Sequence, residues 1–242
     1  MEAIRAEGLT KILAGRTVVD GVDLSVRAGE ILGFVGPNGA GKTTTWSMLT
    51  GLWKPTAGRV RLLGRPVDAN DAWLKRQLGI VADQSCLFEG LTGQELLFAY
   101  GRLYGLRGPE TERRVDELLS AFDLDASRNQ TVATFSNGMK KKIRLAAAIL
   151  HGPRVVFLDE PFEGMDAASV RVAMRILKEM ANGGAAVFLT SHLLDYVERL
   201  STHLIVIKEK AESSLPARET SFRRRSIRVS EKMAPAGLKT CS

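Results

Sequence analysis

Short apolar runs alternate along the chain with longer segments of helical spacing. Compact runs rich in β-branched residues predict strands, whereas apolar residues that recur every three or four positions predict helices. We expect strands over Ile4–Thr10, Arg16–Val26, Glu30–Val35, Gly58–Gly64, Arg154–Asp159, Ala185–Thr190 and Leu204–Ile207, and Lys75–Val81 leads into a further strand that ends near Ala82–Asp83. We expect helices over Thr44–Leu49, Glu95–Tyr104, Glu110–Phe122, Met139–Leu150 and Ala168–Asn182. The pattern predicts an α/β core that is interrupted by a helical insertion of about sixty residues.

Composition fits an ordinary globular protein. The chain has 242 residues, of which 45% are hydrophobic and 25% charged, enough for a large core in one or two domains. No apolar run approaches the roughly 18 residues needed to span a bilayer, and the first residues do not resemble a signal peptide. We therefore expect any membrane role to depend on a partner. The two cysteines, Cys86 and Cys241, predict no disulfide framework and fit a reducing compartment.

The net charge of +7 is unevenly distributed. Residues 208–242 hold nine basic and four acidic side chains, so the rest of the chain is close to neutral. A basic tail of this kind is usually solvated. We therefore expect no nucleic-acid partner.

A glycine-rich segment between an expected strand and an expected helix is suited to bind a triphosphate. It reads Gly36-Pro37-Asn38-Gly39-Ala40-Gly41-Lys42-Thr43-Thr44. Glycines let successive N–H groups point at the phosphates, and a helix that begins at the lysine adds its positive dipole end. Lys42 can reach the β- and γ-phosphate oxygens, and the Thr43 hydroxyl can ligate Mg²⁺. This context favours nucleotide binding over a chance glycine turn.

An apolar strand that ends in two carboxylates predicts the other half of the site. Residues 155–158 are all apolar and precede Asp159 and Glu160. Such a run is typical of a parallel strand buried on both faces, and ligands bind at the carboxyl ends of these strands. We expect Asp159 to face Mg²⁺, directly or through water, and Glu160 to polarise the attacking water. A solvated acidic strand end would be the simpler interpretation without the phosphate loop.

Two further segments place polar residues at the ends of elements. Residues 135–139, Phe-Ser-Asn-Gly-Met, form a helix N-terminus with Ser136 as its cap, and helix N-termini bind anions. Residues 190–192, Thr-Ser-His, end another expected strand. A lone histidine is usually structural, but His192 at a strand end beside a triphosphate is well placed to sense the γ-phosphate.

From about Ala3 to Ile207 the sequence resembles the ATP-binding subunits of ABC transporters, because five motifs follow in that family's order and spacing. Residues 36–44 resemble Walker A, residues 135–139 a variant of the signature Leu-Ser-Gly-Gly-Gln, and residues 155–160 Walker B with its catalytic glutamate. Residues 163–166 lie where the D-loop falls, and His192 where the switch histidine falls. The signature form Ser-x-Gly-Met and Leu-Tyr-Gly-Leu at 103–106 are most similar to bacterial drug or antibiotic exporters.

The resemblance implies an α/β fold with a P-loop NTPase (RecA-like) core sheet, an antiparallel β subdomain and an inserted helical subdomain. The cassette would span 1–207, with a core of 1–84 and 151–207 and a helical subdomain of about 85–150. The resemblance also implies ATP and Mg²⁺ as cofactors, and ATP hydrolysis that uses Lys42, Glu160 and His192. The protein would be cytoplasmic and peripheral on the inner face of the cell membrane, bound to a separate membrane permease.

Two cassettes of this family pair head to tail when ATP is present, as a homodimer or with a second cassette. By resemblance, the nucleotide held by one subunit is then contacted from the other by the signature and D-loop residues Ser136, Asn137, Gly138, Met139 and Asp166. ATP thus joins the pair and hydrolysis releases it, a two-state element biased by a ligand.

Four positions depart from the family pattern. Asp83 occupies the Q-loop position, where Gln is usual; it can still ligate Mg²⁺, but with a shorter reach and a negative charge. Leu13 falls where an aromatic side chain commonly stacks on adenine, so we expect weaker base affinity and base selectivity. Asn137 replaces a signature glycine but tolerates left-handed backbone, whereas Met139 replaces Gln and loses a polar contact.

Residues 208–242 are the largest departure. They are rich in Ser, Arg and Lys and have poor periodicity, which predicts disorder. A frameshift is the alternative explanation of this tail, because codons can be chosen for residues 208–214 that encode, after removal of one base, Lys-Glu-Gly-Arg-Ile-Val, the continuation expected of the family.

Two other functions remain open at this point. A degraded, non-hydrolysing regulatory subunit is favoured by the departures at Leu13, Asp83 and the tail. A non-transport ATPase of the same superfamily usually carries a long coiled coil or two cassettes, and the sequence has neither. A small-molecule kinase is disfavoured, because nothing in the sequence indicates an acceptor pocket.

Overall fold

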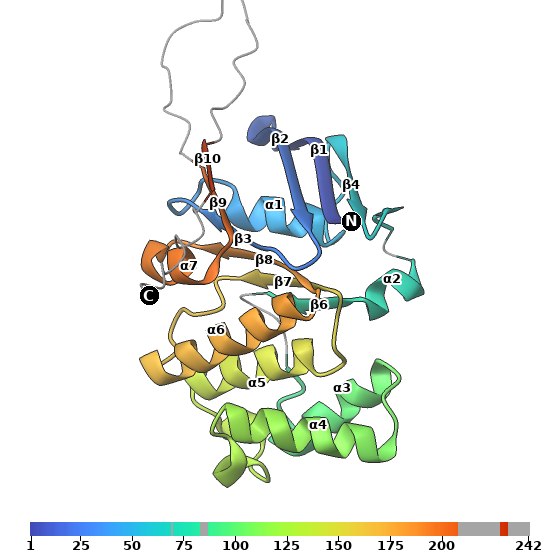
Figure 1. The fold of residues 1–242 in the computed structure, drawn as a ribbon, viewed down its shortest axis with the longest axis vertical. Coiled ribbons are helices and arrows are strands. Elements are labelled where there is room, and N and C mark those ends of the chain that lie inside the picture. Colours follow the sequence, from blue (N-terminus) through green and yellow to red (C-terminus); the bar gives the residue numbers. More distant parts are fainter. Residues whose placement is uncertain (69, 83–86, 208–227, 232–242) are drawn as a thin grey trace, which may run out of the picture.

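The computed structural model describes residues 1–68, 70–82, 87–207 and 228–231. Figure 1 shows two sheets in the upper half of the molecule and a group of helices in the lower half. Asp83, Cys86, Cys241 and all of the basic segment 208–242 except 228–231 lie outside the described residues. The predictions for these positions therefore stay predictions.

The first sheet is antiparallel and has the order β2-β1-β4-β5. Its strands are β1 (Glu2–Leu13), β2 (Arg16–Arg27), β4 (Ala57–Leu62) and β5 (Arg65–Pro66). Along β2, Val22, Leu24 and Val26 are buried while the residues between them are exposed. This period of two turns one face of the sheet toward the core and confirms the antiparallel β subdomain.

The second sheet has the order β10-β9-β3-β8-β7-β6, in which every pair is parallel except β10 with β9. Its strands are β3 (Ile31–Val35), β6 (Leu78–Val81), β7 (Val155–Asp159), β8 (Ala186–Ser191), β9 (His203–Val206) and β10 (Arg228–Glu231). Every residue of β3, β7 and β8 is buried. These strands are covered on both faces, which explains their continuous apolar runs.

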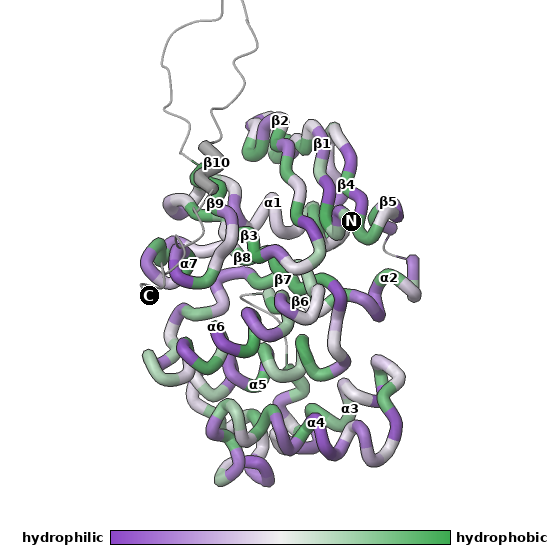
Figure 2. Tube along the Cα trace, in the orientation of Figure 1, coloured by the Kyte–Doolittle hydropathy of each residue, from purple (hydrophilic) through white to green (hydrophobic). Residues whose placement is uncertain are grey.

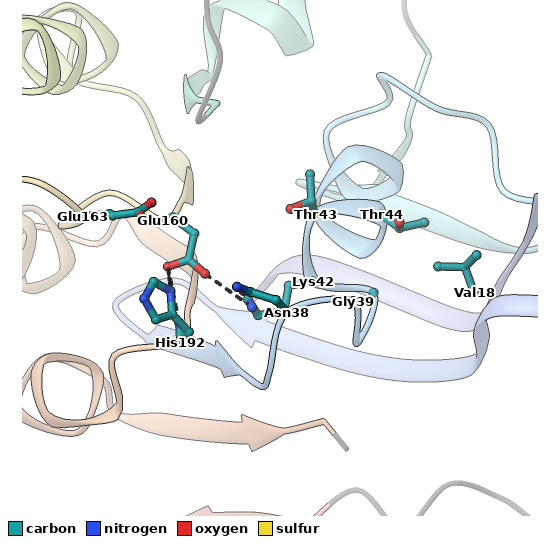
Figure 3. Close-up of a pocket in the computed structure, with 10 residues that line it drawn as sticks. Val18, Asn38, Gly39, Lys42, Thr43, Thr44, Glu160, Glu163 and His192 are labelled. Carbon is teal, nitrogen blue, oxygen red and sulfur yellow. Dashed lines mark hydrogen bonds and ion pairs between the residues drawn. The ribbon is translucent and has the colours of Figure 1, made fainter. Parts of the chain in front are cut away.

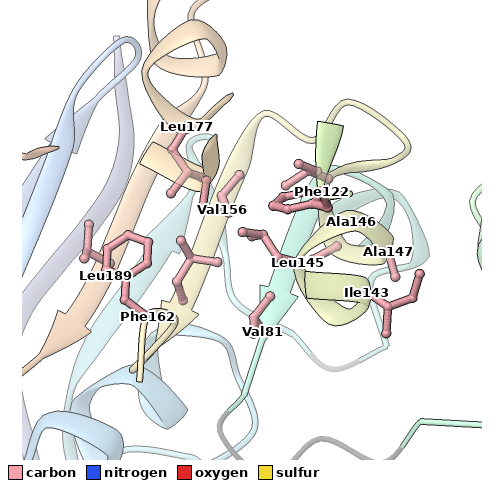
Figure 4. Packing of buried hydrophobic residues seen from close by; sticks show 14 of the residues in the cluster. Val81, Phe122, Ile143, Leu145, Ala146, Ala147, Val156, Phe162, Leu177 and Leu189 are labelled. Carbon is pink, nitrogen blue, oxygen red and sulfur yellow. The ribbon is translucent and has the colours of Figure 1, made fainter. Parts of the chain in front are cut away.

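Alternate side chains of this sheet enter two different cores. Phe34, Phe157 and Phe188 pack toward the antiparallel sheet and the helix α1 (Lys42–Leu49). Val156 and Leu189 point to the other face, where they meet the helices α5 (Asn137–Ile149) and α6 (Ala167–Asn182), as Figure 4 shows. Figure 2 shows the same arrangement as hydrophobic strands at the centre and alternating colours on the helices.

The remaining helices lie in the lower half of the molecule and at its two sides (Figure 1). They are α3 (Gly93–Leu103) and α4 (Gly108–Ala121), the short α2 (Ala72–Arg76) and α7 (Leu194–Leu200), and the 3₁₀ turns Asp125–Ser127 and Val132–Thr134. A capping box fixes the start of α3, since Thr92 and Glu95 each accept the other's backbone N–H. In Figure 1, α3 and α4 lie farthest from the antiparallel sheet. None of the helices within the described residues has the length and apolar character to cross a membrane.

The predicted α/β class is confirmed, and the structure adds elements that the pattern did not predict. Helices α2 and α7 span two turns or less, which is too short for an apolar period to be recognised. Strand β1 continues to Leu13, three residues past the predicted end at Thr10, because it pairs with β2 up to Arg16. The proposed division at 84 and 150 is not tested by these elements.

Candidate nucleotide-binding site

A cleft of about 440 Å³ lies at the carboxyl ends of β3, β7 and β8 (Figure 3). One side is the glycine-rich loop with the start of α1, and the other side comes from the segments after β7 and β8. The lining residues are Val18, Asn38, Gly39, Gly41, Lys42, Thr43, Thr44, Glu160, Glu163 and His192. The topology thus joins three segments that are far apart in the sequence.

The loop curls because two of its glycines adopt left-handed backbone. Gly39 has a φ of 81° and Gly41 a φ of 95°, which side-chain-bearing residues rarely adopt. Lys42 is the first residue of α1 and is only 6% exposed. Its ammonium donates to the carbonyl oxygens of Gly36 at 2.9 Å and Pro37 at 3.2 Å. The lysine is therefore held within the loop, at the positive end of the helix.

Gly36 is required for a reason that the sequence did not reveal. A Cβ at this position would lie 2.5 Å from Ile207 Cγ1 and 2.7 Å from the Ile207 carbonyl oxygen. The close approach is to the chain just after β9. Ala40, in the same loop, is buried.

Glu160 lines the cleft and has a left-handed backbone conformation, with a φ of 46°. Its N–H donates to both the carbonyl oxygen and the hydroxyl of Thr190, each at 3.2 Å. Its Oε1 lies 3.4 Å from Lys42 Nζ, and its Oε2 accepts the His192 N–H at 3.2 Å and lies 3.0 Å from His192 Nδ1. A strained backbone held by several bonds is typical of functional positions, and here it brings the three predicted catalytic residues together.

Asp159 takes a different position from Glu160. It is 2% exposed and accepts a hydrogen bond from the Thr190 hydroxyl. It ends β7 but does not line the cleft, whereas Thr43 does. Among the described residues no three His, Cys, Asp or Glu side chains are grouped so as to hold a metal ion. Mg²⁺ usually takes one or two protein oxygens and completes its shell with water and substrate phosphates, so Thr43 and Asp159 fit this donor set.

The signature residues do not line the same cleft. Ser136 caps α5, where its hydroxyl accepts the Met139 N–H at 3.2 Å, and Asn137 and Gly138 form the first turn of that helix. A Cβ on Gly138 would lie 3.4 Å from the Gly164 carbonyl oxygen, so this turn packs beside the segment after Glu160.

Asp166 also lies outside the cleft lining. It caps α6 and accepts from the Ser169 hydroxyl and N–H. These bonds, the hydroxyl bond first, lower the pKa of Asp166 to about 2.

Leu13 lies at the exposed end of β1 and does not line the cleft, while Val18 of β2 does. Sequence reasoning missed Val18, and it quoted Thr190 and Glu163 without giving either a role. Thr190 could have been recognised as a hydroxyl at the carboxyl end of a buried strand. Val18 carried no such signal, because its position beside the loop, where a Cβ on Gly41 would lie 3.1 Å from the Val18 carbonyl oxygen, is a contact between distant segments.

Comparison with protein families identifies the fold and its relatives. The family model described as ABC transporter matches residues 19–163. The chain is 37% identical over 205 residues to the daunorubicin/doxorubicin resistance ATP-binding protein of Streptomyces peucetius, covering 85% of this chain and 62% of that protein. It is 34% identical over 206 residues to the linearmycin resistance ATP-binding protein of Bacillus subtilis, covering 85% of this chain and 66% of that protein. The chain thus spans less than two thirds of these relatives.

Solved structures of ATP-binding cassettes have the same fold as this chain. The chain matches an ATP-binding subunit of an ABC transporter with a TM-score of 0.79 and 30% identity, over 86% of this chain and 88% of that one. It also matches, in fold, a dimeric ATP-binding cassette bound to ADP and Pi, with a TM-score of 0.77 and 22% identity, over 88% of this chain and 99% of that one.

Proposed function

The chain belongs to the ABC transporter family, and on that premise we propose that it is the ATP-binding and ATP-hydrolysing subunit of an exporter. The observation that carries this proposal is the position of Glu160, whose carboxylate lies between Lys42 and His192 beside the phosphate loop. A carboxylate, a lysine and a histidine at a loop of inward N–H groups suit the transfer of a phosphoryl group to water.

In the proposed reaction each residue has a separate task. Lys42 and the loop N–H groups neutralise the β- and γ-phosphates, and Glu160 accepts a proton from the attacking water. Among the described residues, Glu160 Oε1 receives no hydrogen bond and is paired only with the Lys42 ammonium at 3.4 Å, so we assign the proton to this oxygen. His192 holds Oε2 and so orients the carboxylate. Mg²⁺, held by Thr43 and Asp159, would neutralise charge on the phosphates.

The signature residues act in a paired assembly under this proposal. Because Ser136 and Gly138 lie away from their own cleft, we assign them to the nucleotide of a second cassette. The protein would be peripheral on the inner face of the cell membrane, bound to a permease that supplies the transport path. The relatives from Streptomyces peucetius and Bacillus subtilis are named for drug or antibiotic resistance, which supports a drug-like substrate for this exporter as well.

Phosphate release from Mg-ATP tests the proposal. The wild type should turn over, and Glu160→Gln should lose at least about 100-fold in rate, a typical loss for a general base. Glu179→Gln, a change on the exposed surface of α6, is the matched control and should leave the rate unchanged. Light scattering should detect dimers of Glu160→Gln only when Mg-ATP is present. A wild type that binds ATP without turnover would favour the regulatory subunit.

A further inference from the structure

A second carboxylate, Glu163, lines the same cleft as Glu160. Figure 3 shows both on one side, across from Thr43 and Thr44. Its place is fixed by a tight turn, because the Glu163 N–H donates to the Glu160 carbonyl oxygen at 3.4 Å and Gly164 follows with a φ of 72°. The proposed reaction does not use this carboxylate.

Glu163 leaves the charge of the cleft unfavourable for a polyanion. Of the ten lining residues, Lys42 is the one with a permanent positive charge, and Glu160 already lies 3.4 Å from its ammonium. Lys141 approaches Glu163 at 3.9 Å from outside the lining, but the Glu163 side chain is 54% exposed. Because 3.9 Å is beyond hydrogen-bond distance and the carboxylate is half-exposed, the ammonium offsets only part of the carboxylate's charge.

We propose that Glu163 is a specificity-determining residue that disfavours a nucleoside triphosphate relative to a diphosphate. The proposal rests on the proposed function, because it assumes that this cleft holds ATP. The γ-phosphate adds negative charge at the end of the nucleotide nearest Glu160 and Glu163, whereas ADP ends one phosphate earlier. Like charges in one cleft repel, so Glu163 raises the ATP concentration needed to fill the site and favours departure of the cleaved phosphate.

The size of the effect follows from the electrostatics of a partly exposed pair. For an assumed separation of about 8 Å between two unit charges, and an effective dielectric of about 40, which lies between protein-surface and bulk-water values, an equilibrium constant changes about fivefold. Removal of the Glu163 charge should therefore tighten ATP binding about fivefold and ADP binding less than about twofold. The effect should shrink at high ionic strength, because salt screens exposed charges.

Calorimetric titration with ATP and with ADP, in EDTA to prevent hydrolysis, tests this inference at about 50 mM and about 500 mM salt. Glu163→Gln should gain ATP affinity selectively at low salt. Glu163→Asp, which keeps the charge, should retain the wild-type ratio of ATP to ADP affinity, as should Glu179→Gln on α6.

Equal changes for both nucleotides, a gain that persists at high salt, or no change in Glu163→Gln would overturn the inference. Each of these results leaves the proposed function intact, because the wild type still binds ATP. A wild type that binds neither nucleotide would overturn both proposals.

Discussion

Thr190 holds together the two acidic residues of the cleft, and its replacement by valine tests how the site is built. The side chain is fully buried at 0% exposure. Its hydroxyl donates to Asp159 Oδ1 and accepts the Glu160 N–H at 3.2 Å. Valine has nearly the same shape but replaces the hydroxyl with a methyl group, so the substitution removes both hydrogen bonds at once.

The loss of stability in Thr190→Val can be estimated from the hydrogen-bond partners that remain. Asp159 loses a hydrogen bond to a charged group, worth about 1.5 to 3 kcal/mol, while the Glu160 N–H keeps its second acceptor, the Thr190 carbonyl oxygen. The methyl group also cannot approach Asp159 as closely as the hydroxyl did, so the carboxylate must shift. We expect the free energy of unfolding to fall by about 2 kcal/mol and ATP turnover by at least about tenfold, because small displacements of catalytic groups are costly.

Urea denaturation and phosphate release measure the two effects on the same samples. Thr190→Ser is the matched control, since it keeps the hydroxyl and should recover most of the wild-type rate. If Thr190→Val matched the wild type in both assays, the hydrogen bonds would not position the carboxylates and the reasoning would be wrong. A loss of stability without loss of turnover would confine the role of Thr190 to the fold.

Three further predictions concern other parts of the molecule. Ser136→Ala removes the cap of α5 and should lower the free energy of unfolding by about 1 kcal/mol in urea, with Ser136→Thr close to the wild type. Gly36→Ala places a Cβ 2.5 Å from Ile207 Cγ1 and should lower the melting temperature, whereas Gly90→Ala meets no atom within 4 Å among the described residues and should not. Burial lowers the pKa of His151 from 6.5 to about 4, so the unfolded state binds more protons between these pH values. The free energy of unfolding of the wild type should therefore fall by about 2 kcal/mol from pH 6.5 to pH 4, a value reduced for solvent screening. His151→Phe should lack this pH-dependent loss.

The sequence predicted those parts of the site that depend on local pattern. The phosphate loop is specified by consecutive residues, and β7 and β8 by apolar runs that only a doubly covered parallel strand tolerates. The predicted strand ends placed Glu160 and His192 at one edge of the sheet, where Glu160 Oε2 lies 3.0 Å from His192 Nδ1. The assignment of Asp83 to Mg²⁺ stays a prediction, because this residue lies outside the described part of the chain.

The parts that were not predicted depend on contacts between distant elements. Val18 lines the cleft because β2 packs against the phosphate loop at Gly41, a contact that no local pattern encodes. The need for glycine at Gly36 comes from Ile207, far along the chain. Leu13 was expected beside the adenine base, yet it lies outside the cleft lining. Its effect on base selectivity stays a prediction.

The short segment 159–166 links the cleft to α5, and this link gives a reason for a charge at Glu163. The segment begins at Asp159 under the Thr190 hydroxyl and ends at Asp166, the cap of α6. Between these ends it lies beside α5, since Lys141 is 3.9 Å from Glu163 and Lys142 is 3.7 Å from Asp166. A triphosphate that repels Glu163 therefore acts on a side chain that also contacts the helix carrying the signature residues. If the inference about Glu163 holds, the charge that weakens ATP binding lies on the same side chain that contacts Lys141 of α5.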